Sequence, residues 1–154
     1  MIKLIAAIDT KRGIASGGKI PWDIPHDQQR FLDLTKGGVC VMGTATYEDM
    51  GQALPDRRNI VLNPDPNYKL DDAEVMQDLD AAIAIAPDVW VIGGAEIFKQ
   101  TIDRADMLEI TKVDGDYGCD RFFPPFENDF VLTNSSLPMQ ENGTTFVYAT
   151  YSRK

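Results

Sequence analysis

The sequence predicts one α/β domain over residues 1–154, a three-layer arrangement in which helices cover both faces of a mixed, mostly parallel sheet. Up to residue 113, apolar runs typical of buried strands alternate with helix-like stretches, which is the order expected of a parallel sheet. After it, Phe130–Ser136 and Thr145–Tyr151 flank the turn signal Glu141-Asn142-Gly143 and predict an antiparallel hairpin at the sheet edge. Together these runs predict a sheet of about eight strands.

The first half of the chain contains a long loop between its first strand and its first helix. We expect a buried strand at Ile2–Ile8 and then a loop at Asp9–Ile24, whose glycines allow it to move over a ligand. This segment, called the lid loop below, exceeds the roughly two to six residues usual in α/β units. Pro25 suits the first turn of the next helix, and Gly37-Gly38 ends it. The elements expected here are the helix Pro25–Thr35, the strand Val39–Met42 and the helix Thr44–Met50, which Gly51 closes.

The second half continues the same alternation. Val89–Ile92 is apolar at every position, as expected of a strand that is covered on both faces. Pro87 ends the helix before it. The elements expected here are the strands Asn59–Leu62 and Glu74–Met76, the helix Asp78–Ala86, the strand Val89–Ile92, the helix Ala95–Ile102 and the strand Met107–Val113.

An acidic residue occupies a position where the first helix should be apolar. Asp27, Phe31 and Leu34 share one face of that helix, and the two apolar residues predict that this face points inward. A buried carboxylate without a partner is costly, so it is usually kept for a function. Trp22 lies just before it, in a turn bracketed by prolines. The pair predicts a recognition site for a flat, nitrogen-rich ring.

Charge and composition narrow the possible partners. The formal net charge of −9 disfavours nucleic acid and anionic membrane surfaces. No apolar run approaches the roughly 20 residues of a membrane span. Met1–Ile8 is too short for a signal peptide and suits a buried strand better, so we expect a cytoplasmic protein. A monomer is the default expectation.

Two strand ends are each followed by glycine and a helix. Val89–Ile92 precedes Gly93-Gly94, and Val39–Met42 precedes Gly43. Glycine lets the backbone approach a ligand closely, and a helix N-terminus favours phosphate. Tight packing explains either junction equally well when it is taken alone. Two such junctions in one small sheet suggest a dinucleotide lying across the strand ends.

Several single side chains allow two interpretations. Arg57 is either a solvated surface arginine or a bidentate clamp for a substrate carboxylate. Thr111 either faces the core or donates a side-chain hydrogen bond. His26, the only histidine, is expected to be exposed and receives no catalytic role. Cys40 is expected to be a buried small hydrophobe, and its spacing from Cys119 predicts no metal site.

In order and spacing, these motifs resemble the dihydrofolate reductase family nearly from end to end. The matching segments are Leu4-Ile5-Ala6-Ala7, Ile20-Pro21-Trp22, Asp27 with Phe31, Val41-Met42-Gly43, Thr46, Leu54-Pro55 before Arg57, Asn59-Ile60-Val61-Leu62, Val91-Ile92-Gly93-Gly94 with Ile97-Phe98, Thr111, and Asp120 before Phe123-Pro124. The resemblance implies an oxidoreductase that reduces 7,8-dihydrofolate to tetrahydrofolate with NADPH. Such an enzyme serves one-carbon metabolism and binds antifolates.

The resemblance also implies residue roles. Asp27 would bind the 2-amino group and N3 of the pterin, with Thr111 behind it bonding through water, and Trp22 would hold an ordered water. Arg57 would bind the α-carboxylate of the glutamate tail. The implied substrate-binding residues are Ile5, Ala6, Asp27, Gln28, Phe31, Met50, Leu54, Arg57, Ile92 and Thr111. The implied cofactor-binding residues are Ala7, Ile14, Ile20, Gly43, Thr44, Ala45, Thr46, Leu62, Asn63, Ile92, Gly93, Gly94, Ala95, Glu96, Ile97 and Phe98. The lid loop would cover the site and contact Asp120.

The chain departs from the family pattern at the cofactor site. The family usually has a basic residue just after Gly43, which holds the 2′-phosphate of NADPH. Here Thr44 and Ala45 lack a positive charge, and Asn63 replaces a hydroxyl residue. A phosphate without a cation is held less tightly, so NADH is not excluded beside NADPH. Phe98 replaces a usual tyrosine.

Two alternatives stay open from the residues alone. One is a related pterin or pyrimidine reductase of the riboflavin-pathway type, whose substrate has a ribose phosphate and no glutamate tail. The other is a non-catalytic module that binds folate or a nucleotide. The effect of Arg57 on the KM of dihydrofolate tests the first, and tight methotrexate binding without turnover would indicate the second.

Overall fold

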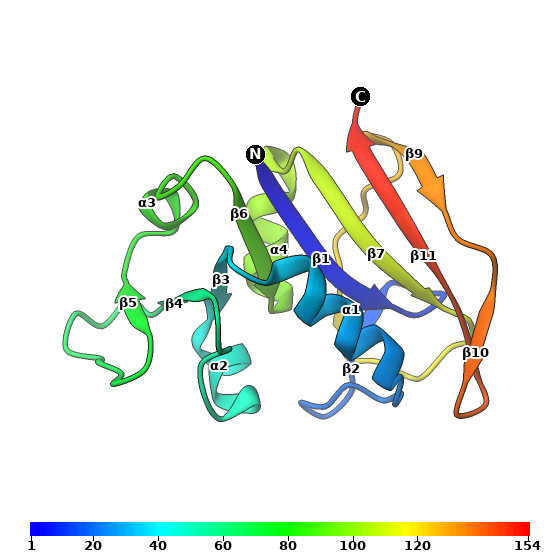
Figure 1. The fold of residues 1–154 in the computed structure, drawn as a ribbon, viewed down its shortest axis with the longest axis horizontal. Helices are drawn as coiled ribbons and strands as arrows, with labels where there is room; N and C mark the ends of the chain where they lie inside the picture. Colours follow the sequence, from blue (N-terminus) through cyan, green and yellow to red (C-terminus); the bar gives the residue numbers. More distant parts are fainter.

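The computed structural model describes residues 1–154 and contains a nine-stranded sheet with four α-helices (Figure 1). The strands of this sheet are β1 (Ile2–Ile8), β3 (Val39–Gly43), β4 (Arg58–Leu62), β5 (Glu74–Met76), β6 (Val89–Gly93), β7 (Met107–Val113), β9 (Phe130–Ser135), β10 (Met139–Glu141) and β11 (Thr144–Arg153). A separate ribbon pairs β2 (Gly13–Ala15) with β8 (Arg121–Phe122). The helices are α1 (Pro25–Thr35), α2 (Thr44–Met50), α3 (Leu79–Ile83) and α4 (Ala95–Thr101), and α4 continues into a 3₁₀ turn, η1 (Ile102–Arg104).

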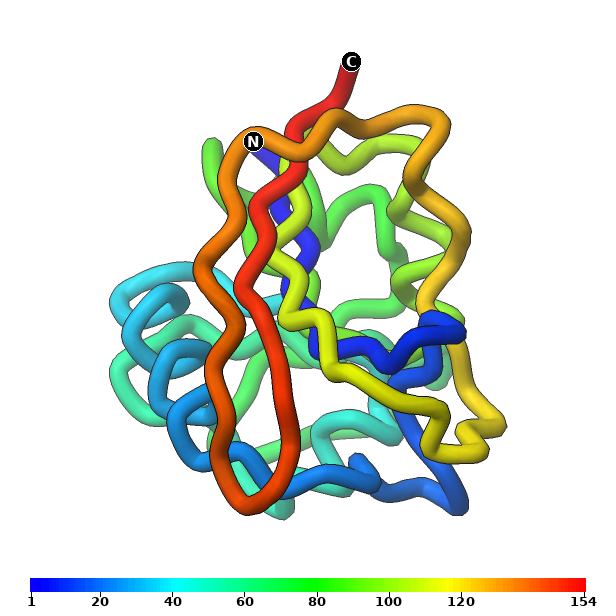
Figure 2. The backbone as a smooth tube through the Cα atoms, turned by 90° about the vertical axis from the view of Figure 1, so that its right-hand side faces the viewer, coloured from blue at the N-terminus to red at the C-terminus, as the bar shows by residue number.

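The sheet has the strand order β10-β11-β7-β1-β6-β3-β4-β5, with β9 also paired to β11. All neighbours from β7 to β5 in this order are parallel, whereas β11 is antiparallel to β7, β9 and β10. In Figure 2 the C-terminal strands run side by side along the sheet edge. The prediction of a mixed, mostly parallel sheet with a C-terminal antiparallel hairpin is therefore confirmed.

Alternating side chains of the central strands pack on opposite faces. Leu4 belongs to a core cluster that includes Ile83 of α3 and Phe98 of α4. Its neighbour Ile5 belongs to a second cluster, against which Phe31 of α1 packs. This period of two is the expected pattern of a strand that is buried on both faces. The two clusters make the three-layer order of helices, sheet and helices.

Five elements of the structure depart most clearly from the sequence prediction. Strand β10 and the β2–β8 ribbon fall within segments that were expected to be loops, because strands of two or three residues have too short a pattern to detect. Helix α3 is shorter than the expected Asp78–Ala86. Leu34 of α1 is exposed, and Thr35 is buried in its place. The inward stripe of α1 therefore continues from Asp27 and Phe31 to Thr35, at a spacing of one further turn.

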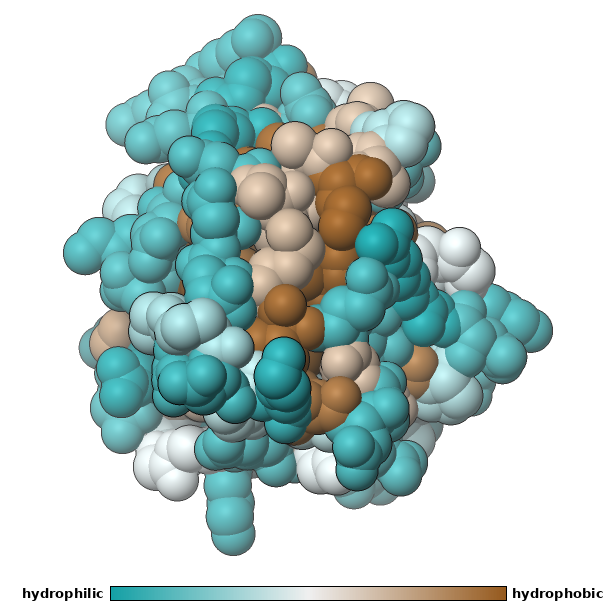
Figure 3. All heavy atoms as spheres, turned by 90° about the vertical axis from the view of Figure 1, so that its left-hand side faces the viewer, coloured by the Kyte–Doolittle hydropathy of each residue, from teal (hydrophilic) through white to brown (hydrophobic).

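The side of the molecule that carries β5 has apolar side chains on its surface. Figure 3 shows a band of apolar side chains there, bordered by hydrophilic residues on both sides. No helix of the structure combines the length and the apolar character that crossing a membrane requires.

Candidate active site

The carboxylate of Asp27 lies between helix α1 and strand β7. Its Oδ1 accepts a hydrogen bond of 2.6 Å from the hydroxyl of Thr111, which is buried on β7. The side chain of Asp27 has no other hydrogen bond within the protein and takes part in no ion pair. The resemblance implied a bond through water to Thr111, whereas the two side chains here are bonded directly. Asp27 thus faces inward, as expected, with its second oxygen free.

Burial raises the pKa of Asp27 above its ordinary value. The hydrogen bond from Thr111 and the positive charges of Arg30 and His26 lower this pKa, but burial outweighs them. A half-buried acid with a raised pKa and a free oxygen is typical of a binding or catalytic site.

Apolar side chains from four strands, two helices and two loops cluster on this face of the sheet. Ile5, at 8% exposure, forms a cluster with buried residues of β3, β4 and β6. Among the half-buried residues that pack against this cluster are four of the predicted substrate contacts: Phe31, Met50, Leu54 and Ile92. Ala6 is the exception, because its side chain packs against the cluster on the opposite face. Gln28 follows Asp27 and is exposed.

Trp22, near the end of the lid loop, is buried. Its ring meets that of Tyr117 edge-on, with centroids 5.2 Å apart. Trp22 also belongs to a small cluster with Ile24 and Tyr148, against which Ala7 packs. This packing fixes the chain just before α1 and so fixes the start of the helix that carries Asp27.

Arg57 is held by neutral groups only. Its Nε donates to the hydroxyl of Thr35 at 2.9 Å, and its two terminal nitrogens donate to the carbonyls of Pro55 and Leu32. Arg57 forms no ion pair with any carboxylate of the chain. The fold therefore holds a half-buried guanidinium beside the C-terminal end of α1, with its charge available to an anion.

The two glycine junctions meet at the carboxyl ends of β3 and β6. A Cβ at Gly43 would lie 3.3 Å from the side chain of Ile97, and one at Gly94 would lie 3.4 Å from the hydroxyl of Thr46. The junction after β3 therefore lies against helix α4, and the junction after β6 lies against helix α2. The sheet brings the two junctions together, as the sequence predicted. Phe98 differs from the other predicted cofactor contacts at this junction because its side chain is only 2% exposed. Its ring packs on Phe123, so it supports the junction from within the core.

The position after Gly43 has its own hydrogen bonds. The hydroxyl of Thr44 donates to the carbonyl of Leu62 at 2.7 Å and accepts from the side-chain amide of Asn63 at 3.1 Å. The carboxyl ends of β3 and β4 are thereby tied together by neutral groups. Among the predicted cofactor contacts, Thr44 and Asn63 are thus in direct contact.

Asp9 anchors the lid loop, a role that the sequence analysis missed. Its carboxylate accepts hydrogen bonds from the backbone N–H groups of Gly13 at 2.7 Å, Lys11 at 2.9 Å and Tyr117 at 3.1 Å. Burial raises the pKa of Asp9, but these backbone bonds and a bond to Cys119 outweigh it, so the pKa lies below its ordinary value. The sequence signal that could have predicted this turn is an aspartate directly after a buried strand with a glycine four positions later.

A second contact joins the lid loop to the segment after β7. The backbone N–H of Gly17 donates to the carboxylate of Asp120 at 3.2 Å, which confirms the expected contact. Strand β2 lies between Asp9 and Gly17 in the chain, and its partner β8 follows Asp120 directly. The resemblance also implies that Ile20 lies at the tip of the lid loop, and its side chain is 66% exposed.

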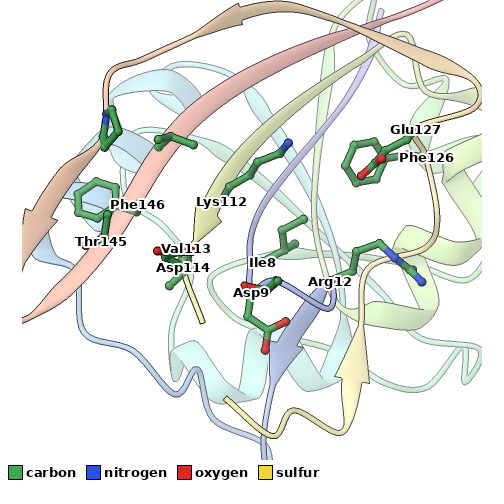
Figure 4. A pocket seen from close by; sticks show the side chains of 13 residues that line it. Ile8, Asp9, Arg12, Lys112, Val113, Asp114, Phe126, Glu127, Thr145 and Phe146 are labelled. Carbon is green, nitrogen blue, oxygen red and sulfur yellow. The ribbon is translucent and has the colours of Figure 1, made fainter. Parts of the chain in front are cut away.

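A cavity of about 430 Å³ lies beside the end of β7, and neither Asp27 nor Thr111 lines it. Figure 4 shows Lys112 and Arg12 extending into this region with Phe126 and Glu127 beside them. Its lining mixes two cations with three carboxylates, those of Asp9, Asp114 and Glu127, so it presents no single charge to a ligand.

A sequence model of the family described as dihydrofolate reductase matches residues 1–153. The chain belongs to the dihydrofolate reductase family. The dihydrofolate reductase of Staphylococcus aureus is 32% identical over 145 residues, which cover 93% of this chain and 91% of that protein. The type 3 dihydrofolate reductase of Salmonella typhimurium is 36% identical over 129 residues, covering 82% of this chain and 80% of that one.

A solved dihydrofolate reductase has nearly the same fold. The enzyme from Enterococcus faecalis, complexed with NADP(H) and RAB-propyl, superposes with a TM-score of 0.91 at 30% identity, over 100% of this chain and 96% of the other. The resemblance of the sequence motifs to the dihydrofolate reductase family is thereby confirmed over the whole chain.

Proposed function

We propose that this chain is a dihydrofolate reductase that converts 7,8-dihydrofolate to 5,6,7,8-tetrahydrofolate with NADPH and so supplies one-carbon metabolism. The observation that supports this most strongly is the free oxygen of Asp27 beside an apolar wall. A pterin offers two parallel N–H donors, from N3 and the 2-amino group, and a carboxylate is the acceptor that matches both.

The substrate would lie with its pterin ring against Asp27 and its benzoyl group between apolar side chains. Ile5, Phe31, Met50, Leu54 and Ile92 form the apolar surroundings. Arg57 lies beyond them and would bind the α-carboxylate of the glutamate tail, because its charge is not paired within the chain. These contacts would fix the substrate at three points, which orients its reacting face.

The residues at the ends of β3 and β6 fit a dinucleotide. A Cβ at Gly43 or Gly94 would narrow the space between the two junctions, and the glycines leave it open to a ligand. Gly43–Thr46 and Gly93–Ile97 would hold NADPH, which supplies a hydride to C6 of the pterin when it is bound. Thr44 and Asn63 provide no cation for a 2′-phosphate. The test of this proposal therefore measures turnover with NADH as well as with NADPH.

The residues of the chain would control the proton that reduction places on N5. Asp27 orients the ring and polarises a water near it, and its raised pKa lets it hold a proton more readily than an exposed aspartate. The lid loop, anchored through Asp9 and Asp120, would exclude bulk water from the site.

The test is turnover of dihydrofolate by the purified protein, followed by oxidation of NADPH. We expect turnover with the wild type and a loss of about 100-fold or more in Asp27→Asn, because the amide no longer accepts both donors or holds the proton. Far-ultraviolet circular dichroism should show the same fold in both proteins. Absence of turnover with either NADPH or NADH would refute the proposal, and methotrexate binding without turnover would indicate a binding module.

Arg57 separates a folate reductase from a reductase of the riboflavin-pathway type. Arg57→Ala should raise the KM for dihydrofolate about ten-fold or more, since a charge-assisted bond is lost. The matched control is a dihydropterin that lacks the glutamate tail, whose KM should change little. An unchanged KM for dihydrofolate would favour the alternative substrate.

We further propose that the protein is a monomer that acts in the cytoplasm, binds antifolates and has no nucleic-acid or membrane partner. The net charge of −9 supports the absence of polyanionic partners. Gel filtration tests the monomer directly.

A further inference from the structure

Helix α1 carries a cation one turn after the acid of the site. Arg30 follows Asp27 by three positions, and residues at this spacing are neighbours on a helix surface. The positive charge of Arg30 lowers the pKa of Asp27, which shows that the two groups sense each other. A guanidinium also presents the two parallel N–H donors that a pterin presents. Arg30 is therefore a potential competitor for the substrate's place.

The structure holds Arg30 away from Asp27. Its Nη2 donates to Oε2 of Glu109 on β7 at 3.0 Å, and its guanidinium lies 4.0 Å from the ring centre of Tyr148 on β11. The side chain of Glu109 is only 11% exposed, and the hydroxyl of Thr150 donates to it at 3.0 Å. A nearly buried carboxylate with these partners is a strong and well-oriented acceptor for Arg30.

We propose that Glu109 is a positioning residue that binds Arg30 and so keeps the carboxylate of Asp27 free for the pterin. This inference rests on the proposed function of the site. Two acids and one cation share the region between α1 and β7, and the cation is bonded to the acid that does not face the substrate. The pairing decides which of the two acids stays free for the ligand.

Other charged or titratable groups near Asp27 do not replace Arg30 in this role. His26 on α1 has its Nδ1 2.7 Å from the hydroxyl of Tyr148. Glu141 of β10 accepts from the backbone N–H of His26 at 2.8 Å. Burial and then the charge of Asp27 raise the pKa of Tyr148 to about 12, so this phenol is neutral at physiological pH. The polar neighbour that β7 supplies to Asp27 is Thr111.

The decisive experiment compares the pH dependence of kcat/KM for dihydrofolate in the wild type and Glu109→Gln. The released Arg30 should pair with Asp27, raise the KM about ten-fold or more, and move the acid limb of the profile to lower pH. Adding Arg30→Met to Glu109→Gln should restore the KM, because the competitor is gone. Thr150→Val is the matched control: it removes one bond to Glu109, leaves the Arg30 pair and should leave the acid limb in place.

Three outcomes would overturn the inference while the wild type turns over dihydrofolate. They are an unchanged profile in Glu109→Gln, failure of the double variant to recover while its circular dichroism is native, and an unmoved acid limb in Arg30→Met alone. The last variant keeps the test decisive if Glu109→Gln does not fold, since loss of the Arg30 charge should move the limb to higher pH. Absence of turnover in the wild type would instead refute the proposed function.

Discussion

At the scale of single residues, the ionisation of Asp27 results from opposing local effects. Burial favours the protonated acid, whereas the hydroxyl of Thr111 and the charges of Arg30 and His26 favour the carboxylate. The raised pKa means that the native state binds this proton more tightly than the unfolded chain does. The free energy of unfolding therefore falls as the pH rises through the native pKa of Asp27 and the buried carboxyl becomes charged. The site keeps this acid because it binds the ligand.

Removing the hydroxyl of Thr111 should shift this balance. In Thr111→Val the pKa of Asp27 should rise further, because the largest stabilisation of its charged form is lost. We expect the acid limb of kcat/KM to move to higher pH, with kcat/KM on that limb lower by about ten-fold. Thr111→Ser retains a hydroxyl and is the control. A limb at the same pH in Thr111→Val would show that the 2.6 Å bond does not govern Asp27.

A second prediction at this scale concerns the cofactor. Thr44 bonds neutral partners, and no cation follows Gly43 directly in the sequence. Thr44→Arg places a guanidinium at that position, and the KM for NADPH should fall about ten-fold because phosphate gains a charge-assisted bond. The KM for NADH, which lacks this phosphate, should stay within about two-fold of the wild-type value. Equal changes for both cofactors would contradict a 2′-phosphate site here.

At the scale of elements, the lid loop is joined to the rest of the molecule by carboxylates at its start and on the segment after β7. Asp9 holds the backbone of Gly13 and Tyr117, which are far apart in the sequence. Asp120 holds Gly17 nearer the tip. The loop is thus tied at its base, while Ile20 at its tip is exposed. A tied base with a free tip is the arrangement that closure over a ligand requires.

Asp9→Asn should loosen the base of the lid loop. The amide presents one acceptor oxygen where the carboxylate uses two, and we expect the free energy of unfolding to fall by about 1–3 kcal/mol at neutral pH. The native pKa of Asp9 is lowered, so its contribution is present above its ordinary value of 3.8 and is lost as the pH falls through the native value. Urea unfolding at neutral and at low pH should show this difference shrinking. Asp49→Asn, at an exposed position, is the control.

At the scale of the whole molecule, the charge of the protein opposes the charge of its proposed ligands. The chain has a net charge of −9, and both dihydrofolate and NADPH are anions. Binding must therefore depend on short-range groups such as Arg57, since the long-range field repels both ligands.

A higher salt concentration should accordingly raise the rate of the reaction at low substrate concentration. Raising the ionic strength from about 0.01 M to about 0.15 M shortens the Debye length from about 30 Å to about 8 Å and screens the repulsion. We expect kcat/KM for dihydrofolate to rise about two-fold or more over this range. Repeating the series with an uncharged, tail-less dihydropterin is the control. A fall in kcat/KM with salt would show that local cations dominate the approach of the ligand.

Most strands and most helices were predictable because their signals are local. Val89–Ile92 is apolar at each position and the structure buries it between two layers. Asp27 with Phe31 was likewise predictable, since helical spacing alone places them on one face. The same reasoning was wrong for Leu34. Leu34 follows Asp27 by seven residues and Thr35 follows it by eight, and either spacing fits one face of a helix. Only the packing of the folded protein shows that Thr35 is the buried one.

By itself, the sequence determined the layers, the family and the acid at the centre of the site, because periodicity and motif order belong to the chain. The tertiary structure alone decided which groups meet: Arg30 with Glu109, Asp9 with Tyr117, and the ribbon of Gly13–Ala15 with Arg121–Phe122. The physical reason is that these contacts join residues far apart in sequence. Sheet order and strand register set their distance, and no local propensity encodes either one.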